Sequence, residues 1–430
     1  MKKLTYPDNK EGLEALRRPT LSYDAIERTV NYIFKDIQMH GDLAVKRYGK
    51  KYDKVDLQSF EVSEEEIEMA EKSVSTDLKN AIQLAKKNIE KFHRAQRTES
   101  FQIETSKGVF CWQEKRAIEK VGLYIPGGTA PLFSTVLMLA IPAKIAGCEE
   151  IIICTPSDKS GGINPAILYA ANLCGITRIF KVGGIQAIAA MTFGTESIPN
   201  VFKIFGPGNQ YVTTAKQMAT KYNVAIDLPA GPSELLVFAD GSANASFVAS
   251  DLLSQAEHGE DSQVILVSKS KKLINEVETE IAEQIIDLPR KEIARKAMCN
   301  SKLIYCKSEL RALELINRYA PEHLIICTEN ENEVVKKIQN AGSVFIGNYS
   351  PESAGDYVSG TNHTLPTNGY AKNYSGVNLD AFLKVITFQR ITKKGLKGIG
   401  SAIEEMAEAE GLIAHKNAVS LRLKYLENEK

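Results

Sequence analysis

The chain has 430 residues, 43% of them hydrophobic and 25% charged, and its formal net charge at pH 7 is +0. A neutral chain has no electrostatic reason to bind nucleic acid or an anionic membrane, and no segment approaches the roughly 18 apolar residues of a membrane span. The first residues lack the apolar run of a signal peptide, so we expect a cytoplasmic protein.

Seven cysteines are scattered along the chain, several inside apolar runs such as "EEIIICTP", and no CxxC pair occurs. This distribution predicts buried free thiols in a reducing compartment and argues against a cysteine-based zinc site.

The length predicts two to four domains, and the pattern of residues changes near position 121. From about residue 20 to 120 the apolar spacing is mainly helical. After that, short β-rich runs, glycine turns and helical segments alternate, which predicts right-handed βαβ units and a mostly parallel sheet. The expected helices of this part cover 131–147, 163–174, 186–192 and 210–221.

The same alternation resumes after residue 262 and predicts a second α/β sheet. Its strands are expected in "QVILVS", "KLIYCKS", "HLIICTE" and "SVFIGN". We expect domain boundaries near residues 123 and 233. The second sheet can recruit the helical N-terminal region, and its domain would then be discontinuous in sequence. The C-terminal stretch after 390 predicts a small helical unit or arm.

Only six histidines occur, and two of them, His40 and His93, lie in charged helical surroundings that predict surface or helix-end positions. Gln255 and His258, three residues apart at the end of a predicted helix, lie on one face and can reach one metal ion. An ordinary helix end, with His258 favourably placed against the helix dipole, explains the same pattern.

Glu322 and His323 follow a proline at the start of an apolar strand. An adjacent acid and imidazole can share proton transfer, although a polar strand cap gives the same pattern. Asp356 and His363 lie in a loop-like stretch rich in Gly, Pro, Ser and Thr. Together with His258 and His415 they form a mixed nitrogen and oxygen set that suits zinc, but no HExxH motif is present.

Three glycine turns, "YIPGGTAPLFSTV", "VGGIQAIAA" and "FGPGNQYV", each lie between a predicted strand and a helix. Backbone amides at such turns can hold phosphates, so a dinucleotide is compatible with them. No complete G-x-G-x-x-G occurs at these turns, and tight structural turns are the alternative explanation.

With these stretches in order, the chain resembles the L-histidinol dehydrogenase family nearly from end to end. The resemblance rests on "GLYIPGGTAPLFSTVLMLAIPAKIAGC", "VGGIQAIAA", "FGPGNQYV", "IDLPAGPSELLV", "DLLSQAEHG", "YAPEHL", "GDYVSGTNHTLPT" and "EAEGLIAHKNAVSLR".

The resemblance implies an α/β fold with two incomplete Rossmann-like, doubly wound domains, small helical or extended terminal elements, and an intertwined homodimer. The expected parts are a first α/β domain (20–123 and 233–377), an NAD-binding α/β domain (124–232), a dimerisation element (1–19 and 378–390) and a C-terminal helical arm (391–430) that reaches the partner's active site.

The implied reaction oxidises L-histidinol to L-histidine through L-histidinaldehyde, with two NAD⁺ consumed per turnover. One Zn²⁺ per active site is expected on Gln255, His258, Asp356 and His415, and the resemblance implies that His415 and Glu410 reach across to the other subunit.

The resemblance makes His323 the proton acceptor in both oxidations and Glu322 the group that activates water to hydrate the aldehyde. Glu257 has no implied role. Implied NAD contacts are Tyr124, Gln186 and Asn209. Implied substrate contacts are Ser233, Gln255, His258, Glu322, His323, Asp356, His363, Glu410 and His415.

Two other functions fit parts of the sequence. One is an NAD- and zinc-dependent alcohol dehydrogenase of the same family that acts on another small polar alcohol. The other is a zinc hydrolase or a non-catalytic metal-binding scaffold that uses no nucleotide, which fits the ligand set but leaves the three glycine turns without a role.

Overall fold

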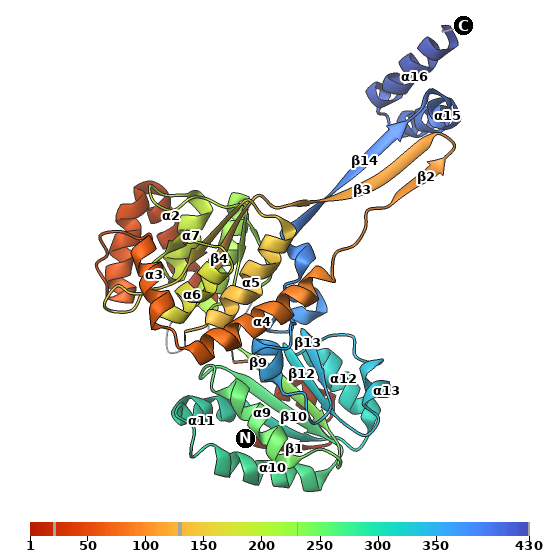
Figure 1. Cartoon of the computed structure of the whole chain (residues 1–430). Coiled ribbons are helices and arrows are strands. Elements are labelled where there is room, and N and C mark those ends of the chain that lie inside the picture. The colour runs from red at the N-terminus through yellow and green to blue at the C-terminus, as the bar shows by residue number, and fades with distance from the viewer. Residues whose placement is uncertain (20–22, 128–130, 230, 429–430) are drawn as a thin grey trace. The chain divides into compact units, whose positions relative to one another are not determined.

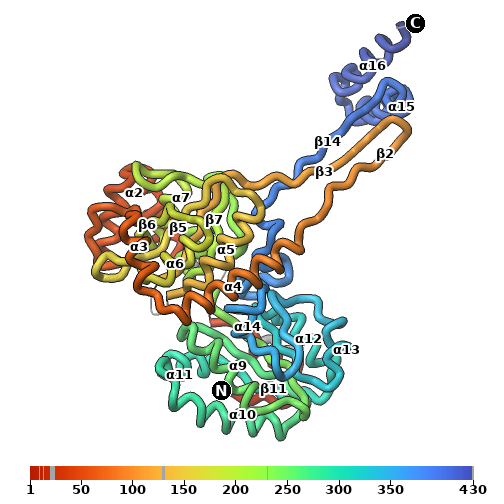
Figure 2. The backbone as a smooth tube through the Cα atoms, in the orientation of Figure 1, coloured from red at the N-terminus to blue at the C-terminus, as the bar shows by residue number. Residues whose placement is uncertain are grey.

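The structure, a computed structural model, describes residues 1–19, 23–127, 131–229 and 231–428 (Figure 1 and Figure 2). Two compact units divide the chain: Met1–Gln96 with Ile118–Phe382, and Arg97–Ala117 with Leu383–Lys430. The first unit contains two parallel sheets, and the second contains an antiparallel sheet and two helices. Among the described residues, we find no helix with the length and apolar character that crossing a membrane requires.

The first parallel sheet has five strands and matches the first predicted series of βαβ units. Numbered along the chain, the strands lie in the order 3-2-1-4-5, which is the order of a Rossmann fold without its sixth strand. Its strands, in spatial order, are β6 (Ile179–Phe180), β5 (Glu150–Cys154), β4 (Lys120–Tyr124), β7 (Lys203–Phe205) and β8 (Ala225–Ile226). Its helices are α5 (Phe133–Ala146), α6 (Pro165–Leu173), α7 (Gly184–Phe193) and α8 (Gln210–Ala219), followed by the short η2 (Thr220–Tyr222).

Three N-terminal helices form an outer layer on this lobe. They are α2 (Tyr23–Tyr48), which contacts α7 and α8; α3 (Glu64–Ser73), which contacts α6; and α4 (Thr76–Arg94), which contacts α5. A short π-helix, η1 (Gly49–Asp53), follows α2. Ile33 and Phe34 of α2 share one buried cluster with Ile188 of α7. We expected residues 20–123 to belong with 233–377, whereas α2, α3 and α4 pack with their apolar sides on the five-stranded lobe.

The second parallel sheet has six strands and repeats the 3-2-1-4-5 order, with β1 added at one edge. Its strands, in spatial order, are β1 (Lys2–Thr5), β11 (Lys302–Tyr305), β10 (Gln263–Ser268), β9 (Glu234–Ala239), β12 (His323–Cys327) and β13 (Ser343–Ile346). The helices are α1 (Asn9–Ala15), α9 (Ala245–Ala256), α10 (Lys271–Gln284), α11 (Lys291–Asn300), α12 (Glu309–Tyr319), α13 (Glu331–Val335) and α14 (Glu352–Tyr357). The turns η3 (Tyr370–Lys372) and η4 (Leu379–Phe382) follow.

The N-terminal segment also differs from the expected division. Residues 1–19 were expected in a separate dimerisation element, but β1 pairs in parallel with β11. Leu4 and Leu16 lie in the same buried cluster as Ile304 and Leu315. The apolar side chains of this segment therefore complete the six-stranded lobe.

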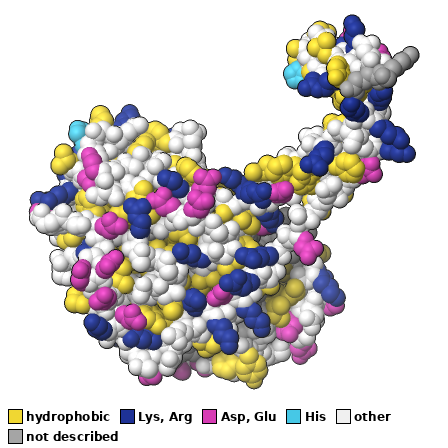
Figure 3. All heavy atoms as spheres, turned by 45° about the horizontal axis from the view of Figure 1, so that its top comes forward, with side chains coloured by type: hydrophobic (Ala, Val, Ile, Leu, Met, Phe, Trp, Pro, Cys, Tyr) yellow, Lys and Arg dark blue, Asp and Glu magenta, His cyan; other side chains and the backbone are white. Residues whose placement is uncertain are grey.

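The second unit combines β14 (Leu383–Ile391), β3 (Val109–Ala117) and β2 (Gln102–Ser106), in this spatial order, with α15 (Lys393–Ala409) and α16 (Ile413–Asn428). The helical expectation is wrong for 102–117, which forms a hairpin that turns at Gly108 (φ +83°). Figure 3 shows hydrophobic side chains along the surface of this unit. Its exposed large hydrophobic side chains are Phe101, Ile103, Val385, Ile386, Ile391, Met406, Leu412, Ile413, Leu421 and Tyr425.

Candidate functional site

The polar residues singled out in the second half of the sequence meet at the amino edge of the six-stranded sheet. Ser233 directly precedes β9, and Glu322 directly precedes β12, which begins at His323 and pairs with β9. Helix α9 returns the chain from the carboxyl edge of β9 to this edge, so Gln255 and His258 arrive at its end. Glu257, which has no implied role, is the C-cap of α9.

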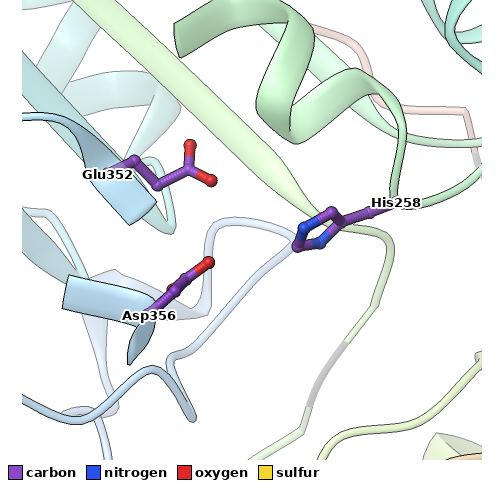
Figure 4. Close-up of side chains that lie close together, drawn as sticks. All are labelled: His258, Glu352 and Asp356. Atoms are coloured by element: carbon purple, nitrogen blue, oxygen red, sulfur yellow. The ribbon is translucent and has the colours of Figure 1, made fainter. Parts of the chain in front are cut away.

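Three side chains form a cluster with the character of a metal site. Nitrogen or oxygen atoms of His258, Glu352 and Asp356 all lie within 4.8 Å of one another, and the three side chains point toward a common space (Figure 4). Glu352 was not among the expected residues. It lies four positions before Asp356 on α14, so the two carboxylates share one helix face, and this spacing is the signal that could have identified it.

Gln255 is fully buried beside this cluster and contacts Glu352. In the amide orientation that satisfies both groups, Nε2 of Gln255 donates to Oε2 and Oε1 of Glu352 at 3.0 and 2.5 Å. The carbonyl oxygen of Gln255 then lies on the side of the amide away from this carboxylate. The side chain of Gln255 thus adds a neutral carbonyl oxygen to the donors in the neighbourhood of Glu352.

His323 has one ring nitrogen engaged and one free. Its Nδ1 lies 3.4 Å from the carbonyl oxygen of Glu234, and this contact fixes the proton on Nδ1. Nε2 makes no hydrogen bond within the described part of the chain and lies 3.5 Å from Oδ1 of Asp356. Burial alone would lower the pKa of His323, but the carboxylates of Glu322, Asp356 and Glu352 outweigh it and raise the pKa to about 10.

Glu322 lies beside His323, with Oε2 3.7 Å from its Nδ1. The same oxygen accepts the backbone N–H of Glu234 at 2.9 Å. Burial raises the pKa of Glu322 to about 8, in spite of the nearby imidazole and this hydrogen bond. Glu234 is itself fixed by a buried ion pair with Arg18, whose guanidinium stacks over the ring of Tyr319. The backbone that holds both Glu322 and His323 is therefore anchored.

Two expected substrate contacts also lie here. Oγ of Ser233 lies 3.4 Å from Nδ1 of His258. Nδ1 of His363 donates to the carbonyl oxygen of Asp356 at 3.0 Å, so its Nε2 accepts the hydroxyl of Thr135 at 2.9 Å. Thr135 comes from α5 of the other lobe and was not predicted, because a threonine inside an apolar helix carries no signal of a polar partner.

Glu410 and His415 belong to the second unit. Glu410 is the C-cap of α15, His415 lies in α16, and both are exposed in the single chain. The first unit thus brings together the expected site residues Ser233, Gln255, His258, Glu322, His323, Asp356 and His363.

A separate cavity of about 1080 Å³ lies at the carboxyl edge of the five-stranded sheet. The three residues expected to contact NAD, Tyr124, Gln186 and Asn209, all line it. Their polar atoms also build it: the Tyr124 hydroxyl accepts the Gly184 N–H at 3.0 Å, and the Asn209 side chain caps α8. Nε2 of Gln186 donates at 3.0 Å to Asp53, a cavity residue that sequence reasoning missed.

The two histidines expected at the surface or at helix ends differ. The side chain of His40 is half exposed and pairs with Asp36. His93 is near the end of α4 as expected, but it is completely buried, so a surface position is wrong for it. Its Nδ1 donates to the Ile89 carbonyl at 2.8 Å, and its Nε2 lies 3.4 Å from Nδ2 of Asn362, next to His363.

Comparison with known proteins identifies the relatives of this chain. A family model described as histidinol dehydrogenase matches residues 16–423. A curated histidinol dehydrogenase of Bacteroides thetaiotaomicron is 60% identical over 99% of this chain and 100% of its own length. The curated histidinol dehydrogenase of Escherichia coli (strain K12) is 51% identical over 97% of this chain and 96% of its own length. The crystal structure of histidinol dehydrogenase from Elizabethkingia anophelis matches with a TM-score of 0.97 at 56% identity, over 100% of this chain and 99% of that one. A family model that spans almost the whole sequence, and relatives this similar over their full length, show that the chain belongs to the histidinol dehydrogenase family.

Proposed function

We propose that this chain oxidises L-histidinol to L-histidine through L-histidinaldehyde, the last steps of histidine biosynthesis, with NAD⁺ as electron acceptor. The observation that carries the proposal is the buried imidazole of His323. Its Nε2 makes no hydrogen bond in the described part of the chain and lies beside the cluster of possible metal ligands, His258, Glu352 and Asp356. The names of its relatives support the substrate. We expect this reaction to take place in the cytoplasm.

His323 is the proposed proton acceptor in both oxidations. A hydroxyl proton must leave as hydride leaves carbon, and the nitrogen that receives it needs a free lone pair. With its proton held on Nδ1 by the Glu234 carbonyl, His323 offers that lone pair on Nε2. The carboxylates that raise the pKa of His323 would be partly neutralised when zinc binds Asp356, so Nε2 would lose its proton and the Glu234 carbonyl would then fix the remaining proton on Nδ1.

Glu322 is the proposed base for the water that hydrates the aldehyde, because an aldehyde yields a second hydride only after water adds to it. We expect Glu322→Gln to slow oxidation of L-histidinaldehyde about 100-fold, in the range of a lost general base, and oxidation of L-histidinol much less. The glutamine side chain can still accept the Glu234 N–H, so the loop geometry is kept. Single-turnover rates with each substrate measure the two effects, and equal losses would contradict this role.

The donors present fit zinc. His258 and Asp356 supply an imidazole and a carboxylate, and Gln255 offers a neutral oxygen, which together form a mixed set that suits a borderline-soft divalent ion. Buried carboxylates at Glu352 and Asp356 need a compensating positive charge. When bound, zinc would fix and polarise the substrate's nitrogen and oxygen donors.

Glu352 is expected to orient the Gln255 ligand. Glu352→Ala should weaken zinc binding about 10- to 100-fold, as loss of an outer-shell partner does, because the Gln255 amide is then free to turn its NH₂ group toward the metal. Competition with a chelator measures the affinity without any need for turnover. Glu329→Ala, an exposed glutamate of the same lobe, is the matched control and should bind zinc like the wild type. Wild-type affinity in Glu352→Ala would contradict the orienting role.

The proposed NAD⁺ site is the cavity lined by Tyr124, Gln186 and Asn209, whose volume accommodates a dinucleotide. When bound, NAD⁺ would accept the hydride from substrate carbon. Pro131 lines this cavity, and Thr135, four residues later, contacts His363 of the catalytic cluster. The start of α5 therefore links the two sites along the chain.

We infer a homodimer in which Glu410 and His415 of the partner subunit complete each site. Apolar side chains such as Met406 and Leu421 are two-thirds exposed in the second unit, which suits a surface covered by another chain. His258 is exposed although Glu352 and Asp356 beside it are buried, so the cluster is open on one side to a further ligand.

The proposed activity is tested with purified protein, L-histidinol and NAD⁺. Two NADH should form for each L-histidine, and no NADH with L-histidinol but turnover of another small alcohol would overturn the proposal. The comparisons do not favour that alternative, and the cavity gives a nucleotide-free hydrolase no support.

A further inference from the structure

A lysine and an aspartate form an ion pair deep inside the five-stranded lobe. Nζ of Lys216 on α8 lies 2.5 Å from Oδ1 of Asp227, which follows β8. The two side chains are 2% and 0% exposed. Burying two charges costs more free energy than an apolar pair of the same volume, so the arrangement calls for an explanation beyond stability.

Both charges bind the backbone of one residue, Gly206. Nζ of Lys216 donates to the Gly206 carbonyl at 2.7 Å, and Oδ2 of Asp227 accepts the Gly206 N–H at 2.8 Å. Oδ1 of Asp227 also accepts the Leu228 N–H at 2.6 Å. The pair thus satisfies the peptide groups on both sides of Gly206, at the point where β7 ends.

Gly206 lies at the point where the strand order of this sheet reverses, between β4 and β7. Its φ is +127°, and a β-carbon there would lie 2.0 Å from the carbonyl oxygen of Tyr124. Such close approach of two backbones is available only to glycine. The ion pair therefore holds the loop that starts at Gly206 against the end of β4.

This loop borders the cavity, whereas the ion pair does not. Tyr124 and Asn209 line the cavity, and Lys216 and Asp227 are absent from its lining. The side chain of Asn209 accepts the N–H groups of Tyr211 and Val212 at 3.0 and 3.1 Å, so the position of Asn209 also sets the first turn of α8. Lys216 lies on the same helix and ties it back to Gly206.

We propose that Lys216 and Asp227 are positioning residues for the dinucleotide: they hold the Gly206–Asn209 loop against Tyr124 so that the cavity has its binding shape before NAD⁺ enters. This inference rests on the proposed function of the cavity as the NAD⁺ site. The pair acts on nucleotide binding only, because it contacts neither the metal-type cluster nor His323.

The test compares the Lys216→Met/Asp227→Asn double variant with the wild type as the full-length protein. The double variant carries no unpaired buried charge, but it loses the bond to the Gly206 carbonyl and cannot accept all the N–H groups that Asp227 accepts. We expect the Kd for NAD⁺, measured by calorimetry, to rise about 10-fold, which is the scale of one lost charged hydrogen bond. The KM for L-histidinol and the zinc content should not change.

Lys120→Met is the matched control. Lys120 is a partly buried lysine at the amino end of β4 in the same sheet, and its Nζ lies 3.3 Å from Oε2 of Glu150, at the edge opposite to the Gly206 loop. It should leave the Kd for NAD⁺ within twofold of the wild type. If the double variant does not fold, Asp227→Glu, which keeps the ion pair but is one methylene longer and displaces the carboxylate from the Gly206 N–H, should raise the Kd about threefold.

A Kd within twofold of the wild type in the double variant, with only the melting temperature lowered, would overturn the inference and leave the pair a purely structural role. Absence of NAD⁺ binding by the wild type would instead overturn the proposed function of the cavity, and this assignment with it. The two failures are distinguished by the wild-type titration alone.

Discussion

Replacing His323 by asparagine should reduce the rates of both oxidations by about 10²- to 10⁴-fold, the contribution of a positioned general base. The asparagine NH₂ group can still donate to the Glu234 carbonyl, as Nδ1 of His323 does. What disappears is the free lone pair on Nε2, which is the only part of the ring that the proposed chemistry uses. Single-turnover NADH formation from L-histidinol and from L-histidinaldehyde measures the two steps separately.

The loss should be similar for the two substrates, because each hydride transfer releases one proton to the same nitrogen. His323 is not among the proposed zinc ligands, so zinc content and NAD⁺ affinity should equal those of the wild type. His40→Asn, at a half-exposed histidine of the other lobe, is the control and should keep full activity. A variant that loses only one oxidation, or that loses its zinc, would assign a different role to His323.

The two parallel sheets could be predicted because buried parallel strands are short apolar runs that end in glycine turns. What the N-terminal helices cover could not be predicted from their own pattern. The clue lies in α7, where residues 185–192 are all buried and no polar face remains. A helix that is apolar all round needs a second layer, and α2 supplies it.

The hairpin at 102–117 was missed because exposed strands rich in charged and polar residues resemble helical surface segments. All five residues of β2 are exposed, so the strand shows no alternation of buried and exposed positions. Its pairing with β3, and that of β3 with β14 some 270 residues later, is a long-range contact without a local signal.

The histidines and acids of the site could be proposed from their residue types. The edge of the sheet at which they come together depends on the topology of the strands and could not be predicted. Active sites of doubly wound sheets usually lie at the carboxyl edge. In the six-stranded sheet, that crevice between β9 and β12 is closed by Asp240, whose carboxylate accepts N–H groups of Ser242 and Glu329. The polar cluster occupies the opposite edge, where α9 ends and β12 begins. Glu352 and Asp53 were missed because carboxylates are common on surfaces and only tertiary packing buries them.

The second large effect is expected at Asp356, which shares the cluster with His258 and whose Oδ1 lies 3.5 Å from Nε2 of His323. Asp356→Asn should weaken zinc binding by more than about 100-fold, because loss of a direct ligand exceeds the effect of an outer-shell change. Activity should fall in parallel and return partly at high zinc concentration. Chelation of the wild type should remove activity, and stoichiometric zinc should restore it. An undiminished rate in a verified metal-free sample would show that the reaction does not need the ion.

Thermal unfolding gives a readout that does not depend on turnover. Burial would raise the pKa of Asp356, but the imidazoles of His323, His363 and His258 outweigh it and lower that pKa, so the ionised carboxylate stabilises the metal-free fold at neutral pH. Asp356→Asn removes this charge, and the metal-free variant should therefore melt somewhat below the metal-free wild type. Zinc at 100 times its Kd should stabilise the wild type by about 2.7 kcal/mol, and the same zinc concentration should stabilise the variant far less. The gap between the two melting temperatures should thus widen when zinc is added. If Asp356 were not a zinc ligand, zinc would raise the two melting temperatures equally and leave the gap unchanged.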